Sequence, residues 1–235
     1  TYAGAAAFDA PGRLVRTVHG RLAQSHSLRE ERRGPRVDAP DQAIAGFLRG
    51  AGVSRGALSV RADRKGDVYI AMIEKPGRPA AEIIAETLEK TVRQFPWPKS
   101  MRWGSGNLRW VRPLHSIICL LSDKAGADII PIEIEGVSVG DTTYGHRFMA
   151  PDPISVTGFD DYQAKLKRAF VLLDAKERKE AILQEASNQA FAVGLDLVDD
   201  RGLLSEVAGL VEWPVVLMGK IDAQFLSLPA EVLQT

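Results

Sequence analysis

The sequence lacks several features that would assign a chemistry at once. In 235 residues it has one cysteine, no net charge and 7% aromatic residues. The lone Cys119 lies in an apolar run, so it can form no internal disulfide, and no Cys or His spacing indicates a zinc site. We therefore expect a buried, inert thiol and no metal centre.

Long apolar runs and phosphate-binding loops are also missing. No apolar stretch approaches the roughly 20 residues that cross a bilayer, and no signal segment is visible. No P-loop is present, and no dinucleotide fingerprint follows a predicted strand. These absences predict a cytoplasmic protein with no membrane partner and no ATP site of its own.

One segment has an unusual charge pattern. Residues 90–122 contain six Lys or Arg and three of the four Trp residues, but no Asp or Glu. Because cations contact phosphates and flat rings stack on bases, this composition is typical of an RNA-binding surface. The alternative is that the tryptophans are core anchors covered by arginine stems. Residues 196–235 hold seven acids and two bases, so they would repel phosphate and face solvent or a protein.

A second candidate segment follows, with a positive charge and a ring in consecutive residues. In Gly145-His146-Arg147-Phe148, Arg147 can grip phosphate or stack on a base, and His146 can donate a hydrogen bond. The alternative is structural, with Arg147 paired to a carboxylate and Phe148 in the core. Together the predicted RNA-binding residues are Lys99, Arg102, Arg109, Arg112, His146 and Arg147, with Trp97 and Trp103 as candidate stacking rings.

No catalytic residue is predicted. His115 and Ser116 are adjacent on a predicted strand, so they point to opposite faces and cannot pair as base and nucleophile. His115 is open to a structural role or to RNA contact, whereas Glu206 and Glu212 sit in apolar motifs that indicate packing. The arginine cluster within Ser27–Asp41 alternates with acids and predicts an exposed, salt-bridged loop.

Hydrophobic patterning predicts an α+β fold, with mixed or antiparallel sheets and packed helices, because strands and helices do not alternate regularly. We expect a single domain over residues 1–235, with possible lobes 1–95 and 96–235. Helices are predicted from Asp41 to Gly50 or Gly52, Pro79 to Phe95, Asp160 to Asp174 and Lys176 to Val193. Strands are predicted over Arg13–His19, Leu58–Ala62, Val68–Glu74, residues 114–121, Ile129–Gly136 and Val215–Ile221.

Several ordered motifs carry a family resemblance. The pattern Phe95-Pro96-x-Pro98-Lys99-x-Met101-Arg102-Trp103-Gly104, followed by Val111-Arg112-Pro113-Leu114-His115, resembles the beta subunit of the bacterial two-subunit glycyl-tRNA synthetase. The further matches are Ala10–Leu14, Arg33-Gly34-Pro35, Gly145–Met149, Leu203–Val207, Leu210–Pro214 and Phe225–Leu233. The family usually has Arg where Gly12 stands.

The resemblance implies an amino-terminal fragment of a longer subunit, similar in fold to the B3/B4 module of the phenylalanyl-tRNA synthetase beta chain. Such a fragment would bind tRNA(Gly) or the alpha subunit, and not DNA. Bond-making, with ATP and magnesium, would belong to the alpha subunit, so no cofactor is expected in this fragment. Two alternatives remain: an editing-type deacylase with a pocket near His115 and His146, or a scaffold for the alpha subunit without RNA contact.

Overall fold

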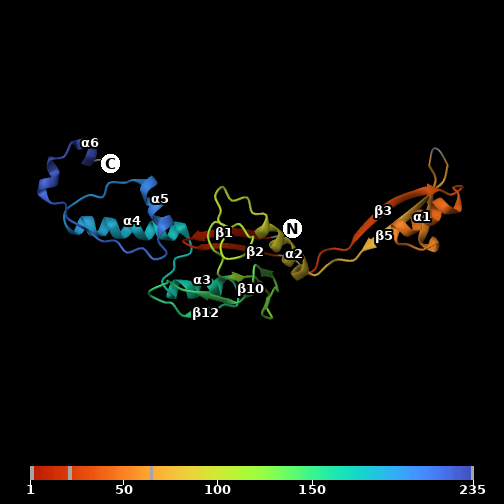
Figure 1. Cartoon of the computed structure of the whole chain (residues 1–235), viewed down its shortest axis with the longest axis horizontal. Helices are drawn as coiled ribbons and strands as arrows, with labels where there is room; N and C mark the ends of the chain where they lie inside the picture. The colour runs from red at the N-terminus through yellow and green to blue at the C-terminus, as the bar shows by residue number, and fades with distance from the viewer. Residues whose placement is uncertain (1–2, 21–22, 64–65, 234–235) are drawn as a thin grey trace. The chain divides into compact units, whose positions relative to one another are not determined.

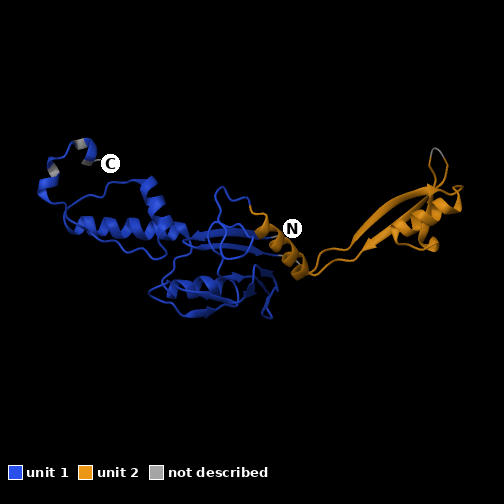
Figure 2. Ribbon diagram, viewed as in Figure 1, with its two compact units in different colours: residues 1–20, 96–235 blue, residues 21–95 orange. Residues whose placement is uncertain are grey.

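The computed structural model describes residues 3–20, 23–63 and 66–233 (Figure 1). The chain divides into two compact units: residues 1–20 with 96–235 form unit 1, and residues 21–95 form unit 2 (Figure 2). Small, mostly antiparallel sheets and separate helices confirm the α+β class. The division between residues 95 and 96 is also the boundary of the two possible lobes, but residues 1–20 group with the later one.

Unit 2 is a three-stranded antiparallel sheet with one helix against it. Its elements are β3 (Leu28–Arg36), α1 (Asp41–Ala51), η1 (Arg55–Ala57), β4 (Leu58–Arg61), β5 (Val68–Lys75) and α2 (Ala80–Arg93). The sheet order is β3-β5-β4, which confirms the predicted β4–β5 hairpin. Helix α1 packs closely on β3, because a Cβ at Gly34 would lie 2.6 Å from the Phe47 ring. As predicted, α1 stops at Gly52, whose φ is 67°, and α2 starts after Pro79.

The loop predicted over Ser27–Asp41 is wrong, because most of it is strand β3. The residues of β3 are mostly charged and do not alternate with apolar ones, so hydrophobic periodicity gives no sign of a strand there. The predicted salt bridging is present: the pairs are Arg29–Glu74, Arg33–Asp63, Arg36–Asp38, Arg61–Glu31 and Lys75–Glu30. The predicted start of α1 at Asp41 is confirmed; Pro40 holds the N-cap position, and Asp41 lies in the first turn.

Unit 1 begins with a hairpin of β1 (Gly4–Ala10) and β2 (Arg13–His19). Strand β2 was predicted, whereas β1 was missed because alanines give a weak alternation. In the two-residue turn, Pro11 fixes the first φ and Gly12 takes a φ of 74°. Phe8 stacks on Phe159 at 5.2 Å between ring centroids, so the hairpin packs against the core. The core residues are Leu166, Val171 and Leu173.

Seven short strands make up the middle of unit 1. They are β6 (Ile117–Ile118), β7 (Leu120–Ser122), β8 (Ala127–Ile129), β9 (Glu133–Ile134), β10 (Val137–Gly140), β11 (Thr142–Tyr144) and β12 (Pro153–Ser155). The pair β6–β10 is parallel and the others are antiparallel. The single strand predicted over 114–121 is two strands separated at Cys119. The strand predicted over Ile129–Gly136 is confirmed only at Ile129, which ends β8, and at Glu133–Ile134, which is β9. Pro131 offers no ladder donor between them, and Glu135 and Gly136 form a turn with positive φ.

The rest of unit 1 is largely helical. It contains α3 (Phe159–Arg168), α4 (Ala175–Ala192), α5 (Arg201–Leu210), η2 (Ala223–Ser227) and α6 (Ala230–Leu233). Helix α4 was predicted nearly to the residue. The helix predicted over Asp160–Asp174 is wrong in its second half, because Phe170 has a φ of 59° and Val171–Leu173 is an irregular, buried segment. The strand predicted over Val215–Ile221 is also wrong, since this segment is irregular and pairs with no strand.

Arg178 on α4 is the fully buried charged side chain of unit 1, with 0% exposure. Its guanidinium donates to four backbone carbonyls: Ala208 at 2.8 Å, Leu172 at 2.8 Å, Leu173 at 2.9 Å and Asp9 at 3.0 Å. These carbonyls belong to α5, to the segment after α3 and to β1. One side chain therefore joins three separate parts of unit 1 to α4.

Replacing Arg178 with methionine should destabilise the chain strongly. Arg178→Met keeps most of the buried volume but leaves four carbonyls without their donor, so we expect the free energy of unfolding to fall by about 3 kcal/mol. Urea denaturation measures this change. Arg168→Met is the control, because Arg168 is exposed and makes no side-chain hydrogen bond or ion pair in the described ranges; it should change stability by less than about 0.5 kcal/mol. Equal effects of the two changes would contradict the role of Arg178.

Candidate nucleic-acid interface

The first candidate segment is a loop over residues 96–112 of unit 1, called the basic loop below. Met101 and Trp110 close it as an antiparallel bridge, with N–O distances of 2.8 and 3.1 Å. Leu108 is buried and anchors its tip, and Gly104 supplies a turn with a φ of 57°. The indole of Trp97 meets that of Trp110 edge to face, with 4.8 Å between centroids. The loop is therefore held in one conformation by its own contacts.

The cations of the basic loop are not neutralised by acids. Lys99, Arg102, Arg109 and Arg112 are exposed, and none of them makes an ion pair with any residue in the described ranges. Arg109 donates through Nε to Ser100 Oγ at 3.2 Å, and Arg112 donates to its neighbour, the Val111 carbonyl, at 2.9 Å. This differs from strand β3 of unit 2, where most arginines pair with carboxylates.

One carboxylate does lie against the basic loop. Glu135, in the turn between β9 and β10, accepts a hydrogen bond from the Asn107 amide at 3.3 Å. This hydrogen bond reaches the backbone at the loop tip. Residues 96–112 contain four Lys or Arg and no Asp or Glu, so the loop itself carries a positive net charge.

The tryptophans of the basic loop are half-buried. Trp97 and Trp110 pack on each other, so the expected alternative, in which the rings anchor the loop, describes part of what they do. Trp103 is likewise half-buried and keeps part of its ring surface accessible. Base stacking by Trp97 or Trp103 stays a prediction.

The second candidate segment is the turn over residues 145–149, which is tightly fixed. Gly145 is buried, and a Cβ there would lie 2.5 Å from the Ala169 Cβ and 2.8 Å from the Ala150 carbonyl oxygen. The His146 amide donates to the Ala169 carbonyl at 2.9 Å. His146 Nδ1 accepts from the amides of Phe148 at 3.3 Å and Met149 at 3.4 Å, so the ring fastens the turn from within.

The tip of this turn presents a cation and a ring to solvent. Phe148 is 82% exposed, and the guanidinium carbon of Arg147 lies 5.8 Å from the centre of its ring. Arg147 makes no ion pair in the described part of the chain. The structural alternative, with Arg147 paired to a carboxylate and Phe148 in the core, is therefore wrong. The turn therefore presents an exposed ring and a cation side by side, the pair of groups that can contact a base and a phosphate.

Two residues that were not predicted as site residues hold this turn from behind. Arg13 of β2 donates through Nε to Glu212 at 2.6 Å and through its other nitrogens to the Gly145 carbonyl at 3.1 Å and to Thr143 Oγ1 at 3.4 Å. Both partners of the ion pair are largely buried. Both residues lie in family motifs, so the sequence marks each of them. Their pairing joins positions 199 residues apart, and no local sequence pattern predicts such a contact.

The two candidate segments are not joined by direct contacts. His146 and Arg147 make no hydrogen bond, ion pair or ring contact with the basic loop among the described residues. His115 follows the basic loop by three residues, is exposed and lies just before β6. The predicted residues therefore form two patches on unit 1 with no direct contact between them in the described ranges.

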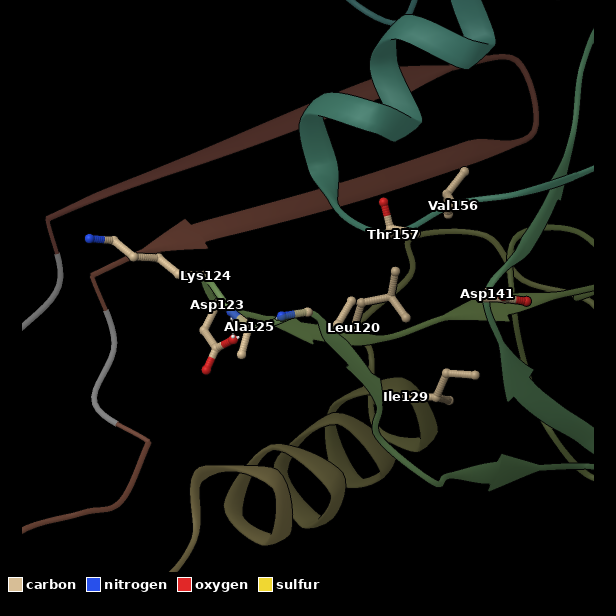
Figure 3. Close-up of a pocket in the computed structure, with 10 residues that line it drawn as sticks. Leu120, Asp123, Lys124, Ala125, Ile129, Asp141, Val156 and Thr157 are labelled. Carbon is tan, nitrogen blue, oxygen red and sulfur yellow. Dashed lines mark hydrogen bonds between the residues drawn. The ribbon is translucent and has the colours of Figure 1, made fainter.

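A pocket of about 380 Å³ lies elsewhere, between the β7–β8 turn and the start of α3 (Figure 3). It is lined by Leu120, Asp123, Lys124, Ala125, Gly126, Ala127, Ile129, Asp141, Val156 and Thr157, and so by neither His115 nor His146. The hydroxyls of Ser155 and Thr142 donate to Asp141 and lower its pKa. Asp123 accepts from the amides of Ala125 and Gly126. Both acids serve as local acceptors, which does not suit a general acid.

Metal binding and membrane insertion find no support in the described ranges. No group of three or more His, Cys, Asp or Glu residues there could hold a metal ion. No helix in the same ranges is long and apolar enough to span a bilayer. Cys119 is half-buried, and burial raises the pKa of its thiol, so the thiolate is disfavoured.

Comparisons with known proteins give the family. The model of the family described as glycyl-tRNA synthetase beta subunit matches residues 1–235. Relatives named glycine–tRNA ligase beta subunit are 67% identical in Ruegeria sp. TM1040, 65% in Paracoccus denitrificans and 63% in Cereibacter sphaeroides, each over the whole chain. The chain spans 34% of the length of each of these relatives. This chain belongs to the glycyl-tRNA synthetase beta subunit family, which confirms the resemblance carried by its motifs.

Filling the space at Gly145 should disturb the turn that carries His146 and Arg147. Gly145→Ala forces the turn away from Ala169, so we expect the free energy of unfolding to fall by about 1–3 kcal/mol. Gly209→Ala is the matched control, because Gly209 lies in α5 with nothing within 4 Å of the added Cβ. That change should be neutral or stabilising by up to about 1 kcal/mol. Chemical denaturation of both variants checks the prediction, and a Gly145→Ala protein as stable as the parent would contradict it.

Proposed function

We propose that this chain is part of the beta subunit of a cytoplasmic glycine–tRNA ligase, in which it provides a surface for tRNA(Gly) and supports assembly with the alpha subunit. The whole complex would join glycine to tRNA in an ATP-dependent reaction. The chain itself would make no bonds, and ATP and magnesium would bind the alpha subunit. The family membership and the 63–67% identity to three beta subunits support this proposal.

The observation that carries the RNA-binding part is the uncompensated charge of the basic loop. The four cations of this loop form no ion pair with an acid in the described ranges, so each can contact a phosphate. They are Lys99, Arg102, Arg109 and Arg112. Contacts of this kind release counterions from the nucleic acid, which makes binding favourable and sensitive to salt. Because Met101 and Trp110 fix the loop, little conformational entropy is lost when it binds.

The turn over residues 145–149 would add a contact of a different kind. Arg147 can hold a phosphate, and the exposed ring of Phe148 beside it can stack on an unpaired base. Since His146 Nδ1 accepts two amide hydrogens, Nε2 is the nitrogen left to donate to RNA. The two patches would therefore contact different parts of one tRNA.

The deacylase alternative gains no support from the pocket of Figure 3, because the predicted histidines do not line it. Its acidic residues are held by local hydrogen bonds, as described above. The likeness of the fold to the B3/B4 module stays a prediction. Assembly with the alpha subunit also stays part of the proposal. It does not require the cations of the basic loop.

Reversing two charges of the basic loop should weaken tRNA binding in the complete enzyme. In a full-length beta subunit reconstituted with its alpha partner, Arg102→Glu with Arg112→Glu should raise KM for tRNA(Gly) by about tenfold or more at low salt. The loss should shrink as salt rises, and the slope of log affinity against log salt should fall by about one for each contact removed. Steady-state charging with glycine at several salt concentrations measures both quantities.

The control is Arg16→Glu with Arg49→Glu, which reverses two exposed arginines outside the basic loop that make no ion pair with any described residue. These variants change the net charge equally and should leave KM for tRNA within about twofold of the parent. An unchanged KM in the Arg102 and Arg112 variant would exclude the basic loop from tRNA binding and favour the scaffold alternative.

A further inference from the structure

The chain after α4 exposes a large amount of apolar surface, called the apolar segment below and defined as residues 191–221. Ala208 is the one buried side chain in this stretch, which the structure describes throughout. Phe191, Leu217 and Val198 are 85%, 86% and 88% exposed. The exposed large apolar residues are Phe191, Val193, Leu195, Leu197, Val198, Leu203, Leu210, Val215, Leu217, Met218 and Ile221. Eleven exposed large apolar side chains within 31 consecutive residues exceed the scattered exposure that is usual for a soluble protein, so this stretch is a candidate binding surface.

The apolar segment is held in place on one side. Gln189 of α4 donates to the Val216 carbonyl at 2.8 Å, and Asp200 caps α5 by accepting from the Leu203 amide at 2.9 Å. Arg178 ties α5 to α4 through Ala208. Val216 and helix α5 are therefore both tied to α4, which places the apolar segment along this helix.

Charge decides which kind of partner this surface fits. The apolar segment contains five acids and two bases: Asp196, Asp199, Asp200, Glu206 and Glu212 against Arg201 and Lys220, and Asp222 follows directly. A net negative surface repels phosphate, so tRNA is a poor occupant. An apolar surface with a polar rim fits a protein surface.

The family supplies the source of that protein surface. The relatives are about three times as long as this chain, which spans 34% of their length. A covalently linked segment binds at a high effective concentration, so it covers an apolar surface more readily than a separate subunit of equal fit. We propose that the apolar segment is an internal docking surface, covered by another part of the same beta subunit. This inference rests on the family membership and is independent of tRNA binding.

Hydrogen exchange in the full-length beta subunit tests the proposal. The amides of residues 215–221 donate no backbone hydrogen bond within the described residues, so on an uncovered surface they should exchange at nearly the intrinsic rate. If another part of the subunit covers them, their exchange in the beta subunit alone should be slower by about tenfold or more. Leu217→Asp should abolish this protection, whereas Leu28→Asp, at an exposed residue of β3, should leave it unchanged.

Each other outcome overturns the proposal. Protection that appears after the alpha subunit is added assigns the surface to that subunit, and protection that depends on beta subunit concentration assigns it to a second copy. Rapid exchange of residues 215–221 in the complete enzyme excludes any cover. Since Leu217 lies outside both RNA-binding patches, the salt dependence of KM for tRNA should be unchanged in Leu217→Asp, so the two proposals can fail separately.

Discussion

The arrangement of unit 1 depends on the burial of one guanidinium group. Arg178 is fully buried without a carboxylate, and four backbone carbonyls take the place of the water it has lost. Removing a charge from water costs several kcal/mol, so this site is stable only if every donor is well placed. The requirement acts on the whole unit, because the carbonyls come from β1, α5 and the segment after α3. The surface turn at Gly145 is then fixed by a second buried cation, Arg13, which pairs with Glu212.

Local periodicity predicted the elements that are stabilised locally. Helix α4, helix α1 with its glycine end, and the β4–β5 hairpin follow from patterns within about 20 residues of chain. The failures lie where distant partners decide. After α3 the residues Val171–Leu173 leave the helix because distant partners hold them. The carbonyls of Leu172 and Leu173 accept from Arg178, the Leu172 amide donates to the Glu212 carbonyl, and the side chains of Val171 and Leu173 pack with the β1–β2 hairpin. Strand β3 was missed because its charges pair with β5 and β4, and a solvated ion-pair face has no apolar alternation.

The candidate site was predictable to the extent that composition determines it. A run of cations without acids identified Lys99, Arg102, Arg109 and Arg112, and their lack of ion pairs follows from the lack of nearby acids in sequence. The exposure of Phe148 was not predictable, because a phenylalanine usually enters the core and the packing of Gly145 on Ala169 turns this one outward. The support from Arg13 and Glu212 was equally hidden, since 199 residues separate the partners.

Zero net charge conceals three different surfaces in this chain. Strand β3 and its neighbours carry many charges but neutralise most of them in exposed pairs, each of which contributes little to stability. The basic loop carries fewer charges but leaves them uncompensated, so its local potential is larger than that of β3. The apolar segment combines acids with exposed apolar side chains, which disfavours RNA and favours protein. Net charge is a sum over the molecule, whereas binding responds to the potential at one patch; the pairing of each charge therefore says more about function than the total does.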